Sequence, residues 1–285
     1  MSSKPTIKSV QLTSPHLRAT LISQGAALKS LHLKRPGKAD LPLVLDLGQA
    51  EAYRDNPPHV GAVVGRVAGR IAHGQFKIRA RAFQLAVNEN GHTLHGGPQG
   101  FGQVNWDWAG GSSFRLSSPN GDQGFPGRLE VGVVYSMPHP LTLRLELTAK
   151  VRQTTPVNLT HHPYWTLYDA DVQIAGQYCQ SVDQALIPTG GTDTFVPDLS
   201  GALDHCVQID GQGFRRMARL DHRGQGFAME VWSDASHCQV YNGRAPYLCL
   251  EPQCANDAPN QADVPTIMVN PGQIWKRQIE YRILI

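Results

Sequence analysis

The sequence of 285 residues lacks the features that mark several large classes of protein. No segment approaches 18 uninterrupted apolar residues, the length needed for a membrane-spanning helix, and the opening residues contain no apolar run typical of a signal peptide. Lysine and arginine (26) barely outnumber aspartate and glutamate (23), and they are scattered instead of clustered. A nucleic-acid interface requires clustered positive charge. We therefore expect a cytoplasmic protein that binds neither nucleic acid nor membrane.

Paired cysteines and several catalytic motifs are also missing. The five cysteines form no CxxC pair, and an odd number without a secretion signal argues against a disulfide framework. We expect buried free thiols. The sequence contains no GxSxG elbow, no phosphate-binding P-loop and no HExxH motif. Covalent hydrolysis, phosphoryl transfer and zinc proteolysis therefore lose their usual support, and acid–base chemistry remains.

Alternation of apolar and polar residues is the dominant pattern in the chain. It is clearest in LTLRLELTAKVR (residues 141–152), and shorter runs occur at residues 129–137, 227–233, 238–241 and 279–285. A period of two is typical of half-buried strands. The 28 glycines and 20 prolines lie mostly between these runs, and no long amphipathic helix, linker or repeat is evident. The pattern predicts one all-β domain over residues 1–285, an antiparallel sandwich or barrel.

The segment NLTHHPYWTL carries an unusual concentration of polar and aromatic side chains. Strand alternation places Asn158, Thr160, His162 and Tyr164 on one face and His161 on the other. The first four are hydrogen-bonding groups of the kind that line small-molecule pockets. By residue type alone, this face is equally consistent with a pocket and with an internally satisfied polar face. We expect His161 to be structural.

Four other segments carry candidate side chains with weaker individual signals. His95 lies in the glycine-rich LHGGPQGFG, and Asp204 lies in LDHC after a loop. The arginines of GRVAGRIAHGQF, Arg66 and Arg70, taken alone are best interpreted as solvated. Glu251 closes the apolar run YLCLEPQ, where a strand-end surface carboxylate is the more common interpretation.

Taken together and in order, these segments resemble the aldose 1-epimerase family. The resemblance runs from about residue 60 to the C-terminus through GRVAGRI, NENGHTLHGG, SPNGDQGFPG, NLTHHPYWTL, LDHC, VYNG and LCLEPQCANDAPN. It implies a large antiparallel β-sandwich that holds a monosaccharide in an open cleft, with neither metal nor cofactor. The implied activity is that of an isomerase that interconverts the α and β anomers of a hexose.

The resemblance also implies roles for individual residues where the motifs align. His162 occupies the position of the general acid, and Glu251 occupies that of the general base. Substrate-binding positions correspond to Arg70, His95, Asp204 and Gln239.

Three other functions remain open at this point. The chain could act on a phosphorylated or sulfonated hexose, it could be a silent sugar-binding module, or it could be a glycosidase. The presence of both His162 and Glu251 argues against the silent module. A glycosidase would need two carboxylates flanking one bond, whereas the aligned motifs supply one glutamate and one histidine. The sequence leaves the oligomeric state open between monomer and homodimer.

Two departures from the family pattern suggest a hypothesis about the substrate. Many relatives carry asparagine where this chain has Gly69, and the segment VYNGRAPYLCLE is shorter than in the animal galactose mutarotases and contains Arg244. An arginine beside a more open cleft could bind an anion with two parallel N–H donors. A charged exocyclic group on the sugar is one consequence; a solvated Arg244 and a simple turn at Gly69 form the competing interpretation.

Overall fold

Antiparallel strands dominate the computed structural model, which describes residues 5–56 and 58–285. No α-helix occurs among these residues. The largest sheet has eight strands, in the order β10 (Asp107–Trp108), β11 (Ser113–Ser118), β12 (Leu129–His139), β13 (Thr142–Val151), β26 (Ile274–Leu284), β22 (Phe227–Ser233), β21 (Arg215–His222) and β17 (Asp171–Ile174).

Two further sheets share an apolar cluster with the eight-stranded sheet. The six-stranded sheet has the order β16 (Tyr164–Thr166), β24 (Tyr247–Gln253), β23 (His237–Tyr241), β20 (Asp204–Gln208), β18 (Tyr178–Val182) and β19 (Pro188–Thr194). The four-stranded sheet consists of β1 (Ser9–Thr13), β2 (Leu17–Ile22), β3 (Ala27–Leu33) and β4 (Leu41–Pro42).

Short elements connect these sheets. Four two-stranded pairs are formed by β5 (Ala62–Val64) with β15 (Thr160–His162), β6 (Arg70–Ile71) with β9 (Thr93–Leu94), β7 (Gln75–Ile78) with β8 (Arg81–Gln84), and β14 (Thr155–Pro156) with β25 (Met268–Val269). The short 3₁₀ turns are η1 (Ala50–Arg54), η2 (Ala72–Gly74), η3 (Phe101–Gln103), η4 (Asp122–Gly124), η5 (Arg223–Gln225) and η6 (Ala258–Asn260).

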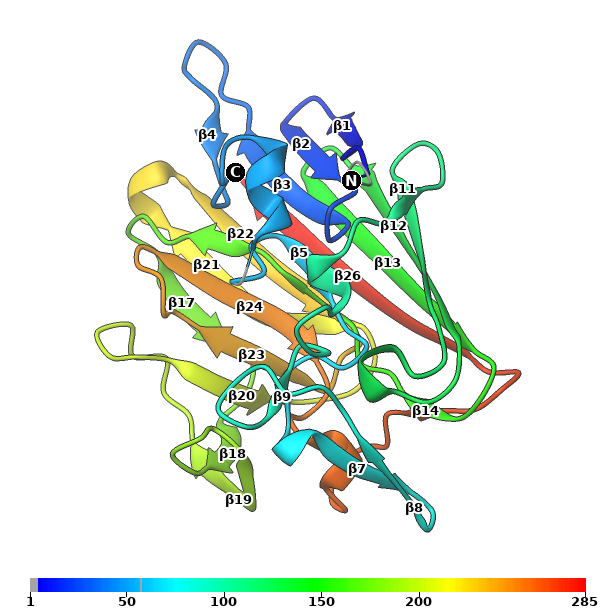
Figure 1. Cartoon of the computed structure of the whole chain (residues 1–285). Helices are drawn as coiled ribbons and strands as arrows, with labels where there is room; N and C mark the ends of the chain where they lie inside the picture. The colour runs from blue at the N-terminus through cyan, green and yellow to red at the C-terminus, as the bar shows by residue number, and fades with distance from the viewer. Residues whose placement is uncertain (1–4, 57) are drawn as a thin grey trace.

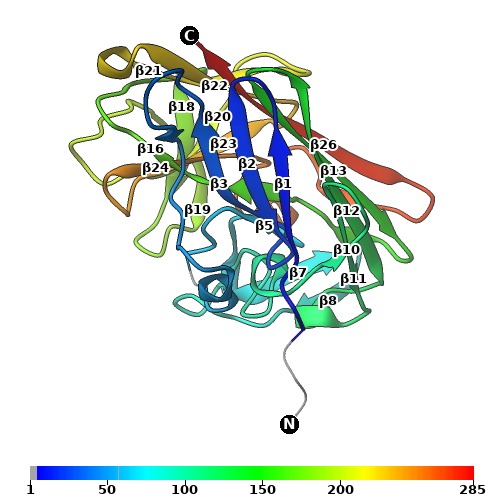
Figure 2. The same ribbon diagram turned by 90° about the horizontal axis from the view of Figure 1, so that it is seen from above.

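One continuous apolar cluster joins the three large sheets. Leu145 of β13, Val240 of β23 and Leu21 of β2 all belong to it and are fully buried. Figure 2 shows β12, β13 and β26 on one side of this core and β20, β23 and β24 on the other. Burial of the inward-facing side chains of both layers stabilises the arrangement. The predicted all-β antiparallel sandwich is confirmed.

The strands predicted from alternation agree with the structure, with one shift. Residues 129–137, 141–152, 227–233 and 238–241 correspond to β12, β13, β22 and β23. The last strand, predicted over residues 279–285, begins earlier, at Ile274. Its first half was missed because Arg277 points inward, where an apolar residue would be expected, and donates to Asn158 Oδ1 and the Leu159 carbonyl.

Buried polar and thiol groups add one correction and one confirmation. Arg66 is 2% exposed, and its guanidinium donates to Ser118 and to the carbonyls of Pro126 and Gly127, so its interpretation as solvated was wrong. The free thiols are as expected: four cysteines are buried and Cys254 is partly buried. Within the described ranges, no helix has the length and apolar character needed to span a bilayer.

Candidate active site

A cavity of about 270 Å³ lies where the connecting segments between β4 and η3 meet the six-stranded sheet. In Figure 1 these segments, in cyan and teal, pass in front of β20 and β23. The cavity brings together all six residues that the sequence singled out as site candidates: Arg70, His95, His162, Asp204, Gln239 and Glu251.

His162 reaches the cavity because the chain changes sheets at Pro163. β15 ends at His162 and pairs with β5, whereas β16 begins at Tyr164 and pairs with β24. Proline donates no backbone N–H to a ladder, so it suits a break between two strands. His162 and Tyr164 both line the cavity, with their rings stacked at a centroid distance of 5.2 Å.

Only two of the four side chains on the predicted polar face of this segment line the cavity. Thr160 donates to the Pro252 carbonyl, and Asn158 Oδ1 accepts from the backbone N–H of Cys254 and from Arg277. These two side chains satisfy buried backbone and guanidinium groups and do not line the cavity. The pocket interpretation therefore holds for His162 and Tyr164 and fails for Asn158 and Thr160.

The neighbouring His161 points into the core, as predicted. It is fully buried between two partners, the Tyr281 hydroxyl at 2.8 Å from Nδ1 and the Gly61 carbonyl at 3.0 Å from Nε2. Burial lowers the pKa of His161 to about 3, so the ring is neutral near pH 7. With Nε2–H donating to Gly61, Nδ1 accepts from the tyrosine hydroxyl, and both nitrogens are satisfied.

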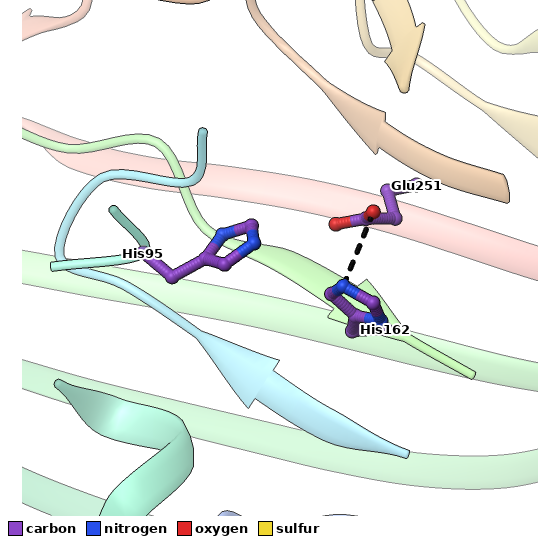
Figure 3. A group of neighbouring side chains, drawn as sticks. All are labelled: His95, His162 and Glu251. Atoms are coloured by element: carbon purple, nitrogen blue, oxygen red, sulfur yellow. Dashed lines mark ion pairs between the residues drawn. The ribbon is translucent and has the colours of Figure 1, made fainter. Parts of the chain in front are cut away.

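His162 and Glu251 contact each other directly. Nε2 of His162 lies 3.3 Å from Oε1 of Glu251, and the two side chains are 5% and 2% exposed (Figure 3). The other carboxyl oxygen, Oε2, is buried without a hydrogen-bond partner, as is Nδ1 of His162. Unpartnered buried polar atoms are rare in folded proteins. Both side chains therefore have hydrogen-bonding capacity available for a ligand.

Burial disfavours the charged form of each partner. It lowers the pKa of His162 to about 3, with His59 nearby as a second cause, and it raises the pKa of Glu251 well above its usual range, with Asp204 adding to the effect. Both shifts favour the form of the pair in which the shared proton lies on the carboxyl group and the imidazole is neutral. Transfer of this proton to His162 gives a carboxylate and an imidazolium without changing the net charge.

A second group of polar side chains also lines the cavity. Arg70 donates from Nε and Nη2 to the two oxygens of Glu89, at 2.6 and 3.1 Å, and from Nη2 to Asp204 Oδ2 at 3.4 Å. The amide of Gln239 donates to the other oxygen of Asp204. The side-chain carbonyl of Gln239 accepts a hydrogen bond from Nδ2 of Asn256 at 3.2 Å. The network fixes these side chains before any ligand binds, which lowers the entropic cost of binding.

His95 completes a cluster whose composition could suggest a metal ion. One ligand atom each from His95, His162 and Glu251 lie within 4.8 Å of one another, and the His95 ring points toward the other two (Figure 3). However, the backbone N–H of Gly69 donates to Nδ1 of His95 at 3.2 Å. Burial also lowers the pKa of His95 well below its usual value. The neutral ring then carries its proton on Nε2, which makes that nitrogen a hydrogen-bond donor and a poor metal ligand.

Comparisons with known proteins identify the family of the chain. The family model described as aldose 1-epimerase matches residues 8–282. The chain belongs to the aldose 1-epimerase family. It is 35% identical to galactose mutarotase of Bos taurus, over 94% of this chain and 91% of that protein, and 27% identical to aldose 1-epimerase of Escherichia coli (strain K12), over 93% and 91%.

Solved structures show the same fold. An aldose epimerase homologue from C. elegans superimposes with a TM-score of 0.90 at 22% identity, covering 98% of this chain and 99% of that one. Galactose 1-epimerase from Lactobacillus acidophilus superimposes with a TM-score of 0.81 at 21% identity, covering 98% of each chain.

The structure explains the glycine at position 69, which is one of the two departures from the aldose 1-epimerase pattern. Gly69 has a φ of +74°, and a Cβ at this position would overlap Oδ1 of Asn256. Asn256 is buried, lines the cavity and is held by Gln253, whose amide donates to Oδ1 at 3.0 Å. A carboxamide therefore occupies the space beside Gly69, although it comes from a distant part of the chain.

Arg244, the other departure, lies in an exposed turn between β23 and β24 and is not among the lining residues. Four further polar side chains line the cavity of this aldose 1-epimerase family member, although the sequence had not singled them out. Glu89, Tyr241 and Asn256 sit in motifs that were recognised, NENG, VYNG and ANDAPN, whereas nothing in the sequence marked His59.

Proposed function

We propose that this protein is an aldose 1-epimerase that interconverts the α and β anomers of a hexose without a metal or cofactor. The observation that carries the proposal is the direct contact of His162 with Glu251 inside a polar cavity, each with an unpartnered buried atom. The names of the bovine and Escherichia coli relatives support the same reaction.

The reaction needs one base and one acid. The Glu251 carboxylate removes the proton from the C1 hydroxyl, and the His162 imidazolium protonates the ring oxygen, so the C1–O5 bond breaks. The C1 aldehyde rotates about the C1–C2 bond, and the ring closes on the other face with the two proton transfers reversed. Each positioned proton-transfer group contributes about 10²–10⁴-fold to the rate. Arg70, Asp204 and Gln239, with His95, hold the sugar hydroxyls during the rotation.

Charge in the cavity favours a neutral sugar. Among the described residues that line it, Arg70 is the one lysine or arginine, and its guanidinium is already paired with Glu89 and Asp204. Arg244 is exposed and is not among the described lining residues, so the cavity wall itself offers no unpaired cation to a charged sugar.

The other two alternatives also lose support. Besides Glu251, the cavity holds two carboxylates, and both are engaged by the arginine–glutamine network, so a glycosidase pair lacks a second free carboxyl group. A silent sugar-binding module would not require an acid and a base in contact.

Anomer exchange tests the proposal directly. Pure α-galactose and α-glucose are dissolved with the enzyme, and the approach to anomeric equilibrium is followed by NMR or polarimetry. We expect catalysed exchange far above the spontaneous rate for the neutral sugars. A rate equal to the buffer rate for every aldose in a broad panel would refute the proposal.

A further inference from the structure

His59 occupies the centre of the cavity wall formed by the connecting segments. The ring is buried with 5% exposure and lines the cavity. Its centroid lies 5.0 Å from that of His95, in an edge-to-face arrangement, and 6.2 Å from that of His162. His59 therefore lies beside both His95 and the proposed general acid.

Hydrogen bonds determine which nitrogen of His59 carries the proton. The side-chain amide of Gln103 donates to the Asn56 carbonyl at 2.7 Å, which fixes the amide nitrogen on this side. The same nitrogen lies 3.3 Å from Nδ1 of His59, so Nδ1 is the acceptor. Burial lowers the pKa of His59 to about 4, so the ring is neutral near pH 7 and its proton is on Nε2. Among the described residues, Nε2 has no hydrogen-bond acceptor.

His59 holds its ring in this orientation through an unfavourable backbone conformation. His59 has a φ of +56°, in the left-handed region that non-glycine residues seldom adopt. The turn is held by Asn56, whose side chain bonds to both backbone groups of Val60. Gly102 packs so closely that a Cβ there would lie 2.8 Å from Nδ1 of the histidine. Such strained positions persist where the surrounding structure fixes them, and they cluster at functional sites.

We propose that His59 is a substrate-binding residue, whose Nε2–H donates to a sugar oxygen on the His162 side of the cavity. Gln103 is then a positioning residue that selects the donating tautomer. The inference rests on the proposed epimerase function and adds a contact that neither the sequence motifs nor the recognised site residues include.

The test replaces the donor while keeping the ring. His59→Phe preserves an aromatic ring beside His95 but has no N–H. We expect kcat/KM for galactose or glucose to fall about tenfold, mostly through a higher KM, which corresponds to about 1.4 kcal/mol for one net hydrogen bond. The shape of the pH profile should not change, because His59 is neutral across the working range. The matched control is His73→Phe, because His73 also has a positive φ (+52°) but is exposed and outside the cavity.

Two more variants distinguish loss of the N–H donor from a folding defect. His59→Gln retains an amide N–H and should recover part of the lost affinity, and Gln103→Met should lower kcat/KM in the same direction by a smaller factor. Unfolding midpoints identify any variant that is simply destabilised. An unchanged kcat/KM in a folded His59→Phe enzyme would overturn the inference while leaving the epimerase assignment intact. Absence of activity in the wild type would instead refute the proposed function.

Discussion

The two walls of the cavity are built in different ways. The strand wall consists of His162, Asp204, Gln239 and Glu251, carried by β15, β20, β23 and β24. Hydrogen bonding between the last three strands positions their side chains, and Gln239 lies directly opposite Glu251 on the neighbouring strand. The loop wall consists of His59, Gly69, Arg70, Glu89 and His95, carried by connecting segments and short strand pairs.

The loop wall relies on backbone conformations that the strand wall does not need. His59, Gly69 and His95 all have positive φ. Gly69 and His95 are tied by reciprocal bonds, one from the Gly69 N–H to the imidazole and one from the His95 N–H to the Gly69 carbonyl. The comparison teaches that regular strand pairing positions the proposed acid and base, whereas the loop wall adds polar side chains through strained backbone conformations. Four experiments can break or sharpen this distinction.

Removal of the proton-transfer groups of the strand wall should have the largest effect. We expect Glu251→Gln and His162→Asn each to lower kcat by about 10²–10⁴-fold, because each keeps the approximate size of the side chain but cannot exchange the proton. The measurement is anomer exchange by NMR, with Glu146→Gln on the exposed face of β13 as the control. Near-wild-type exchange in either folded variant would show that the residue is not an acid or base.

Gly69→Ala tests how tightly the loop wall is packed. The new methyl group would overlap Asn256 Oδ1 and sit at a φ of +74°, so we expect about tenfold lower activity, with a loss of stability exceeding the ~1–2 kcal/mol that a left-handed residue costs alone. Gly91→Ala is the matched control, because its φ is +82° and no atom lies near its Cβ position. Equal effects at both glycines would mean that contact with Asn256 is unimportant; partial recovery in Gly69→Ala/Asn256→Ala would support it.

Acid should destabilise both walls through their neutral histidines. The unfolded chain binds a proton at each histidine near pH 6.5, whereas the folded chain does so only near pH 4 for His59 and pH 3 for His162. The unfolded state therefore binds more protons below pH 6.5, and the free energy of unfolding should fall by up to about 1.4 kcal/mol per pH unit for each such residue. Urea unfolding at pH 7, 6 and 5 measures this slope, which His59→Phe and His162→Asn should each reduce. An unchanged slope in His59→Phe would mean that the loop wall opens before global unfolding.

Glu89→Gln should have the smallest effect, a change in substrate preference. Removing this charge leaves Arg70 with Asp204 as its one carboxylate partner, so a hexose 6-phosphate or hexuronate should gain about threefold relative to galactose, as expected for a modest, partly exposed charge interaction. The measured quantity is the ratio of kcat/KM for the charged and neutral sugars. Arg244→Ala should leave this ratio unchanged. A selective loss on charged sugars in Arg244→Ala would restore the hypothesis of an anion-binding loop.

The sequence determined the sheet architecture and much of the strand wall. Alternation identified β12, β13, β22 and β23 because each strand buries one face, which forces a period of two on the residue types. Ordered motifs then placed His162 and Glu251 together, and the pleat separated His162 from His161. The pattern failed where a buried polar group replaces an apolar one, as at Arg277 in β26, because its partners Asn158 and Leu159 lie more than a hundred residues away in the chain.

The sequence motifs pointed to Arg70 and His95, but the tertiary structure alone decided how the loop wall is assembled. No local pattern shows that Arg66 is buried among distant carbonyls, that Asn256 occupies the space beside Gly69, or that Gln103 fixes the proton on His59. These relations join residues 40 to almost 200 positions apart. Side-chain type and spacing encode which face of a strand is buried, because that is a local property of the backbone. Which partner satisfies a particular buried donor depends on how the connecting segments pack against the sheets, and only the folded chain establishes it.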